Sequence, residues 1–205
     1  MILRALVVLL FLSGGPVAVA EPFPALYDVV GVARDDVLNI RAEPDARAEI
    51  LGTFAPDRRG VEVGAVSDDG GWGQVNAGGR SGWASLTYLE RRDGQEDGDF
   101  PPVRRCLGTE PFWSLGQGAG RWRYETPGGI DVTMDETWRG RSSGRLDRFG
   151  VVMGRAGMRA RMVVARQSCS DGMSDKAFWL TADILIERSD GEREMISGCC
   201  TISSR

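Results

Sequence analysis

Short runs of alternating apolar and polar residues, separated by Gly, Asp and Pro, fill most of the chain. Between residues 37 and 41, Leu38 and Ile40 fall on one side of an extended chain, and their neighbours fall on the other. Such alternation predicts strands with one buried face. In the first half it predicts strands at residues 27–33, 37–41, 50–54, 61–66 and 72–76, followed by a hairpin over 77–84.

The second half shows the same pattern, and no stretch has a sustained helical spacing. Ser189-Asp190-Gly191 lies between the last two apolar runs, where Asp-Gly is a hairpin signal. We therefore predict an all-β protein with a small barrel followed by a second antiparallel β domain. The predicted strands of the second domain cover residues 121–125, 130–138, 158–165, 177–187 and 194–200.

The first 20 residues are typical of a cleaved export signal. Arg4 precedes an apolar run over residues 5–12, and Ala18-Val19-Ala20 supplies the small residues that signal peptidase needs. The run is too short for a membrane span, which needs about 20 apolar residues. We predict a periplasmic or secreted protein with no membrane span after cleavage.

A polar segment at residues 91–103 predicts a linker between domains at 21–90 and 104–205. This segment is rich in Gly, Asp and Pro and has almost nothing to bury. The chain carries 25 basic and 29 acidic residues, a net charge of -4. Nothing is basic enough to indicate a nucleic-acid partner.

Four short motifs follow one another in the first domain: Leu38-Asn39-Ile40-Arg41 with Pro44, Ile50-Leu51-Gly52, Gly71-Trp72-Gly73-Gln74-Val75, and Gly82-Trp83-Ala84 with Tyr88-Leu89. With these motifs, residues 27–90 resemble the bacterial SH3-like domain. The resemblance implies an SH3-like barrel that often binds cell-wall peptide or glycan, and sometimes proteins.

The candidate ligand-binding residues of this domain are Tyr27, Asn39, Arg41, Trp72, Trp83 and Tyr88. The two tryptophans could line a groove, but burial statistics favour the core for aromatic residues in so small a barrel. For Asn39 and Arg41, hydrogen bonds to the backbone of the adjoining loop are favoured over ligand contacts. The two tyrosines are the better ligand candidates, because each has an apolar body and a polar tip.

The four cysteines, Cys106, Cys169, Cys199 and Cys200, all lie in the second domain, where export favours disulfides. A bridge between the adjacent Cys199 and Cys200 would be strained. On a strand these two side chains point to opposite faces, so one is expected to pair with Cys106 and the other with Cys169. Zinc is the alternative, but the spacing lacks the usual C-x₂-C pattern. We predict neither a metal nor a cofactor.

Three further motifs, Gly108-Thr109-Glu110-Pro111-Phe112-Trp113, Cys169-Ser170-Asp171-Gly172-Met173-Ser174-Asp175 and Gly198-Cys199-Cys200, stand in this order in the second domain. Here the chain resembles a family of bacterial envelope proteins that brings no established activity. Glu110 beside Trp113 is a candidate carboxylate in an apolar pocket. Asp171 and Asp175 could ligate a cation, but a disulfide-anchored turn capped by aspartates is favoured.

The chain contains no histidine, which removes the commonest general base and metal ligand. We therefore predict a non-catalytic exported binding protein that contacts peptidoglycan or an envelope protein. Two alternatives remain open. One is a cell-wall hydrolase that uses carboxylates such as Glu110 and Asp171, and the other is an inhibitor of such an enzyme.

Overall fold

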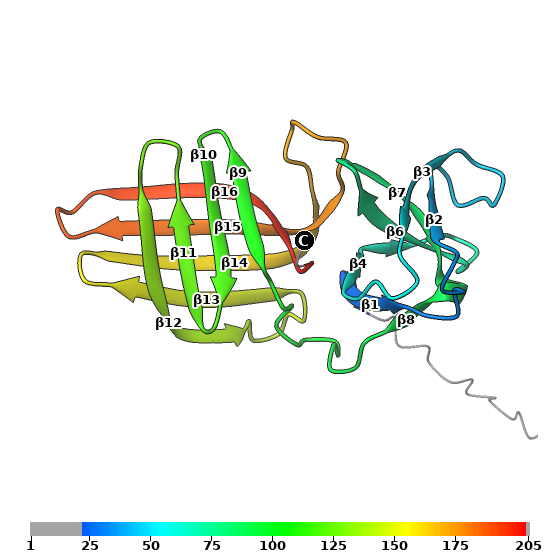
Figure 1. Cartoon of the computed structure of the whole chain (residues 1–205). Helices are drawn as coiled ribbons and strands as arrows, with labels where there is room; N and C mark the ends of the chain where they lie inside the picture. The colour runs from blue at the N-terminus through cyan, green and yellow to red at the C-terminus, as the bar shows by residue number, and fades with distance from the viewer. Residues whose placement is uncertain (1–21, 204–205) are drawn as a thin grey trace, which may run out of the picture.

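The computed structural model describes residues 22–203, so the predicted signal peptide lies outside the described residues. Figure 1 shows two β-rich halves side by side, joined by one extended segment. Within the described residues the one helical element is the short 3₁₀ turn η1 at Leu86–Tyr88. The predicted all-β class is confirmed.

The N-terminal half consists of two small antiparallel sheets packed over one core. The three-stranded sheet has the order β4-β1-β8, and the five-stranded sheet has the order β3-β2-β7-β6-β5. Buried Ile40, Val63 and Val75 lie in the core between them. The strands are β1 (Ala25–Val29), β2 (Leu38–Arg41), β3 (Ile50–Phe54), β4 (Val61–Val63), β5 (Ala65–Val66), β6 (Trp72–Ala77), β7 (Arg80–Ser85) and β8 (Leu89–Arg91).

Two predicted strands of this half differ from the observed ones. The run at residues 61–66 is two strands in different sheets, because β4 pairs with β1 whereas β5 pairs with β6. The run at residues 27–33 ends as a strand at Val29, before Gly31, whose φ of 69° is incompatible with extended structure. Each run is apolar apart from one acidic residue, Asp28 or Glu62, and a mostly apolar run does not mark where a strand stops.

The C-terminal half is a closed eight-stranded barrel (Figure 1). Strands β9 to β16 follow one another as antiparallel neighbours, and pairing of β16 with β9 closes the barrel. Closure leaves no sheet edge unpaired. The strands are β9 (Arg105–Thr109), β10 (Phe112–Gly118), β11 (Arg121–Glu125), β12 (Asp131–Arg141), β13 (Arg148–Arg155), β14 (Met158–Cys169), β15 (Phe178–Arg188) and β16 (Arg193–Thr201).

Large side chains fill the barrel interior, as an eight-stranded barrel permits. Trp122 and Phe149 are almost completely buried there, and each of the remaining barrel strands also contributes buried residues to this core. Sequence analysis missed β9, β10 and β13. In β13, buried Phe149, Val151 and Met153 alternate with residues that include two glycines. The glycines weaken the strand signal, because glycine is depleted in strands.

Two disulfides connect the barrel strands as predicted. Cys106 on β9 pairs with Cys200, and Cys169 at the end of β14 pairs with Cys199. Cys200 belongs to the barrel core, so Cys199 points outward and anchors the loop that follows Cys169. None of the four cysteines is free.

The predicted linker packs against both halves more than its composition indicates. The ring of Phe100 meets Phe149 edge to face, with 5.6 Å between the ring centroids. Val103 is buried, and the Gln95 side chain both accepts from the backbone N–H of Leu26 and donates to its carbonyl. The expectation that this segment buries almost nothing was wrong, because two apolar residues in a polar stretch suffice to dock it.

The two halves contact each other directly. The side chain of Asn76 on β6 accepts from the N–H of Ala177 and donates to its carbonyl, at 3.0 and 2.7 Å. The N–H of Ser81 donates to the carbonyl of Asp175. These bonds connect the hairpin β6–β7 with the loop that precedes β15.

Candidate functional site

The outward face of the five-stranded sheet gathers four of the six predicted ligand residues. Arg41 on β2 lies opposite Trp83 on β7, and Trp83 lies opposite Gln74 on β6. Asn39 lies two residues before Arg41 on β2, and Trp72 lies two residues before Gln74 on β6. Residues two apart on a strand face the same side, so both share this face. All five side chains are half-buried. We call these five residues the tryptophan face.

The expectation that Trp72 and Trp83 belong to the core was wrong. Their strand neighbours Gly73 and Gly82 face inward instead, into very little space. A Cβ on Gly73 would lie 2.8 Å from a Val63 methyl, and one on Gly82 would lie 2.8 Å from the Arg41 carbonyl oxygen. Because only glycine fits inside, the tryptophans take the outer positions. The alternation of Gly and Trp in the sequence was the available signal.

The predictions for Arg41, Tyr27 and Tyr88 have mixed outcomes. Nη1 of Arg41 donates to the carbonyl of Ala48 at 2.7 Å, which confirms that it holds the adjoining loop. Tyr27 is buried in the core, because β1 lies between β4 and β8, and therefore is not a surface ligand residue. Tyr88 is exposed on η1, where its ring lies near Gly31 rather than on the tryptophan face.

The three motifs of the C-terminal half meet at one groove of about 650 Å³ on the outside of the barrel. The groove lies between the loop after Cys169 and the outer surface of β9, β15 and β16. Thr109 of the first motif donates its hydroxyl to the carbonyl of Asp171 in the second, at 2.9 Å. A Cβ on Gly198 of the third motif would lie 2.7 Å from the Trp113 ring. The motifs therefore support one local structure.

Asp171 organises this loop in the way that the turn interpretation predicted. Its Oδ1 accepts from the N–H groups of Met173 and Ser174, and its Oδ2 accepts from the Ser174 hydroxyl. Partial burial alone would raise the pKa of Asp171, but these bonds and the charge of Lys176 outweigh it and lower the pKa. Asp175 does not share this role, since its contact in the structure is made by its backbone carbonyl.

The predicted apolar pocket around Glu110 does not exist. Glu110 lies exposed in the turn between β9 and β10, while Trp113 points into the barrel and is 3% exposed. Side chains of a strand alternate between its two faces, so Trp113 on β10 faces the interior although Glu110, three residues earlier, is exposed in the turn. Glu110 does line the same groove as Asp171 and Asp183, and no basic residue lines it.

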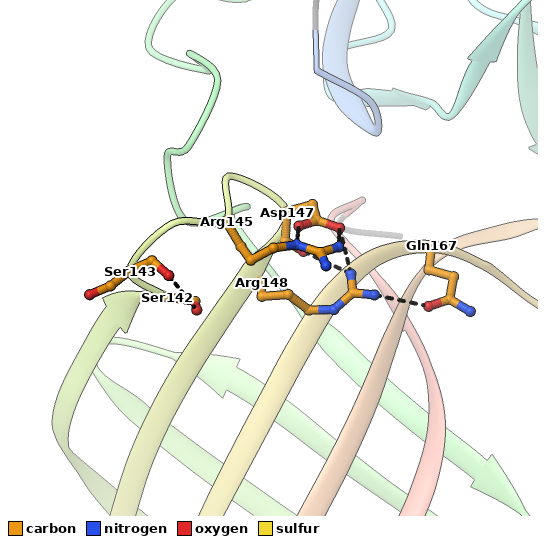
Figure 2. Close-up of polar contacts among 6 residues, drawn as sticks. All are labelled: Ser142, Ser143, Arg145, Asp147, Arg148 and Gln167. Atoms are coloured by element: carbon orange, nitrogen blue, oxygen red, sulfur yellow. Dashed lines mark hydrogen bonds and ion pairs between the residues drawn. The ribbon is translucent and has the colours of Figure 1, made fainter.

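A polar network lies at one end of the barrel (Figure 2), and one of its residues, Gln167, lines this groove. Arg145 binds Asp147 through two hydrogen bonds at 2.8 and 2.9 Å, and Arg148 binds the same carboxylate. The hydrogen bonds from Arg145 are the main reason that the pKa of Asp147 falls to about 2. Arg148 also donates to Gln167, which lines the groove. Ser142 and Ser143 complete the turn through a hydroxyl-to-carbonyl bond.

Sequence analysis missed Glu62, the one charged residue that is buried among the described residues. It lies on β4 and faces the end of β16, where its Oε2 accepts from the Thr201 hydroxyl and from the N–H groups of Ile202 and Ser203. Its Oε1 is buried without a hydrogen-bond partner. Burial raises the pKa of Glu62 to about 7, against the effect of these hydrogen bonds. In the sequence it is one polar residue between two valines, as in any exposed strand.

Comparison with known families supports part of this description. Residues 36–90 match the family model of the bacterial SH3 domain. No curated protein and no solved structure matches the chain. The resemblance of the C-terminal half to an envelope protein family therefore stays a prediction. In the part of the chain that the structure covers, no helix is long and apolar enough to cross a membrane.

Proposed function

We propose that this chain is an exported, non-catalytic protein whose bacterial SH3 domain binds peptidoglycan or an envelope protein through the tryptophan face. The observation that carries the proposal is the placement of two half-exposed tryptophans beside Asn39 and Arg41 on one face. Flat aromatic surface next to hydrogen-bonding groups suits a sugar or peptide ligand. Bacterial SH3 domains often bind such partners.

The disulfides support a location outside the cytoplasm, where thiols pair. The SH3 domain is consistent with the same location. Cleavage after Ala20 would release a chain that starts at Glu21. N-terminal sequencing of the protein recovered from the periplasm or the medium tests this part of the proposal.

Co-sedimentation of the mature chain with purified sacculi tests wall binding. We expect the wild type to pellet, and Trp83→Ala to bind at least about tenfold more weakly, as expected for a central aromatic contact. Trp138→Ala is the matched control, because Trp138 is 53% exposed on the barrel, away from the tryptophan face. Equal pelleting of both variants and the wild type contradicts the role of this face. If no protein pellets, an envelope protein replaces peptidoglycan as the partner.

A second candidate, a carboxylate-dependent wall hydrolase, is favoured by one observation: Glu110 and Asp171 line the same groove. Glycosidases commonly use two carboxyl groups of this kind. Against this, three hydrogen bonds hold the Asp171 carboxylate in a turn. Dye release from labelled peptidoglycan that Glu110→Gln abolishes would establish the hydrolase. No release by the wild type excludes it.

A further inference from the structure

A second groove, of about 550 Å³, lies between the two halves of the molecule, on the side of Glu62. The N-terminal half contributes residues from β3, β4 and β6, and the barrel contributes residues from β9, β15 and the end of β16. Apolar surface in its wall comes from Phe54, Leu107 and Phe178. Neither half forms this groove alone.

Four cations line this groove: Arg58, Arg104, Arg105 and Lys176. Within the described residues none of them makes a side-chain hydrogen bond or an ion pair within 4.0 Å, and the Nε of Arg58 is buried without an acceptor. Several arginines elsewhere on the barrel are paired, as Arg123 is with Asp131 and Arg139 with Glu136, both at 2.6 Å. Lys176 acts electrostatically on Asp171 from a distance, and no ion pair within the described residues neutralises the charge of the three arginines.

This concentration of positive charge runs against the charge of the whole chain, which is -4. Glu62 is the one acidic residue of the groove lining, and it is turned toward Thr201 and the backbone after β16 rather than toward a cation. Like charges that converge without a counter-ion repel one another, so a bound anion would relieve the repulsion. Guanidinium groups also match carboxylates with two parallel hydrogen bonds.

We propose that the groove between the halves binds a carboxylate-bearing peptide, namely the peptide part of the wall polymer to which the SH3 domain attaches. The inference rests on the proposed function for the source of the peptide. The groove places three apolar side chains beside four cations. This lining suits a peptide, which carries both carboxylates and side chains, better than a phosphate chain, which has no apolar part. Because Arg58 belongs to one half and the other three cations to the barrel, the peptide bridges the halves.

Calorimetric titration of the mature chain tests the proposal with soluble fragments that a muramidase releases from sacculi. One preparation keeps its peptide carboxylates, and in the other they are converted to amides. We expect the free carboxylates to bind at least about tenfold more tightly than the amides, with affinity falling as salt rises. Arg105→Gln combined with Lys176→Gln should weaken binding by a similar factor. Arg155→Gln, an exposed arginine outside the groove, is the control and should bind as the wild type does.

The outcomes separate this inference from the proposed function. If fragments bind equally well with amides, or with both cations removed, the groove does not bind carboxylates, although wall attachment through the tryptophan face stands. If neither sacculi nor fragments bind, titration with a tri-glutamate peptide tests the carboxylate site separately from the wall. Tri-glutamate binding that requires Arg105 and Lys176 retains the carboxylate site and overturns the wall as its source. Failure of tri-glutamate to bind overturns the site as well.

Discussion

The indole ring of Trp179 occupies the space beside Gly64 where any other residue would carry its side chain. A Cβ on Gly64 would lie 1.7 Å from the nearest ring carbon. Gly64 separates β4 from β5 in the N-terminal half, and Trp179 is the second residue of β15 in the barrel. The absence of one side chain therefore allows the two halves to approach at this point.

Gly64→Ala is expected to separate the halves locally. A contact of 1.7 Å cannot be relieved by a small shift, so Trp179 must leave its place. We expect a loss of about 1–3 kcal/mol in the free energy of unfolding, the usual cost of overpacking, and faster hydrogen exchange at Ala177 and Ser81. Gly116→Ala is the control, because a Cβ there meets nothing within 4 Å. Equal stability of the two variants contradicts a tight contact.

Glu62→Gln is expected to remove a pH dependence of stability. The pKa of this carboxyl is about 7 in the folded protein and 4.5 in its ordinary state, so the folded protein holds the proton more tightly. The contribution of the Glu62 carboxyl to the free energy of unfolding is therefore complete below pH 4.5 and is lost as pH rises through 7. The free energy of unfolding differs by about 3 kcal/mol between these two limits. The chain has no histidine, so few other groups titrate in this window.

Urea unfolding at pH 5, 6.5 and 8 measures this effect. The wild type should lose stability between pH 5 and 8, and Glu62→Gln should lose much less. Glu90→Gln, which replaces an exposed carboxyl on β8, should follow the wild type. Parallel curves for the wild type and Glu62→Gln would show that the carboxyl does not titrate in this range.

Much of the fold follows from local sequence signals. Leu38 and Ile40 alternate with polar neighbours, and the β2 strand that they predict is present. The adjacency of Cys199 and Cys200 on one strand limits the disulfide pairing, since their side chains must face opposite sides. In both cases the information lies within a few residues of the feature, and short-range geometry is enough to read it.

The remainder depends on contacts between distant segments. Burial of Glu62 results from the tail after β16, which lies about 140 positions away in the chain. The exposure of Trp72 and Trp83 depends on how little space Val63 and Ile40 leave inside. Closure of the barrel requires β9 to meet β16, and no local pattern marks that pairing.

The two disulfides are expected to differ in their contribution to stability. Cys106 and Cys200 are 94 positions apart, whereas Cys169 and Cys199 are 30 apart. The loss of chain entropy in the unfolded state predicts a stabilisation of about 4.7 kcal/mol for the disulfide with the longer loop and about 3.7 kcal/mol for the one with the shorter loop. Denaturant unfolding of the paired alanine variants measures the difference. A larger loss on removal of Cys169–Cys199 would contradict this order.

Asp171→Ala is expected to loosen the loop over the barrel groove without unfolding the barrel. It removes the acceptor for the N–H groups of Met173 and Ser174 and for the Ser174 hydroxyl, while the Cys169–Cys199 bridge still anchors the loop. Amide exchange at Met173 and Ser174 should accelerate at least about tenfold, because two N–H groups lose their acceptor. The cost to the free energy of unfolding should be about 1–2 kcal/mol. Asp175→Ala is the matched control in the same loop, since Asp175 contributes its backbone carbonyl there. Exchange that stays at the wild-type rate in Asp171→Ala would mean that the disulfide, and not the Asp171 carboxylate, holds the loop in place.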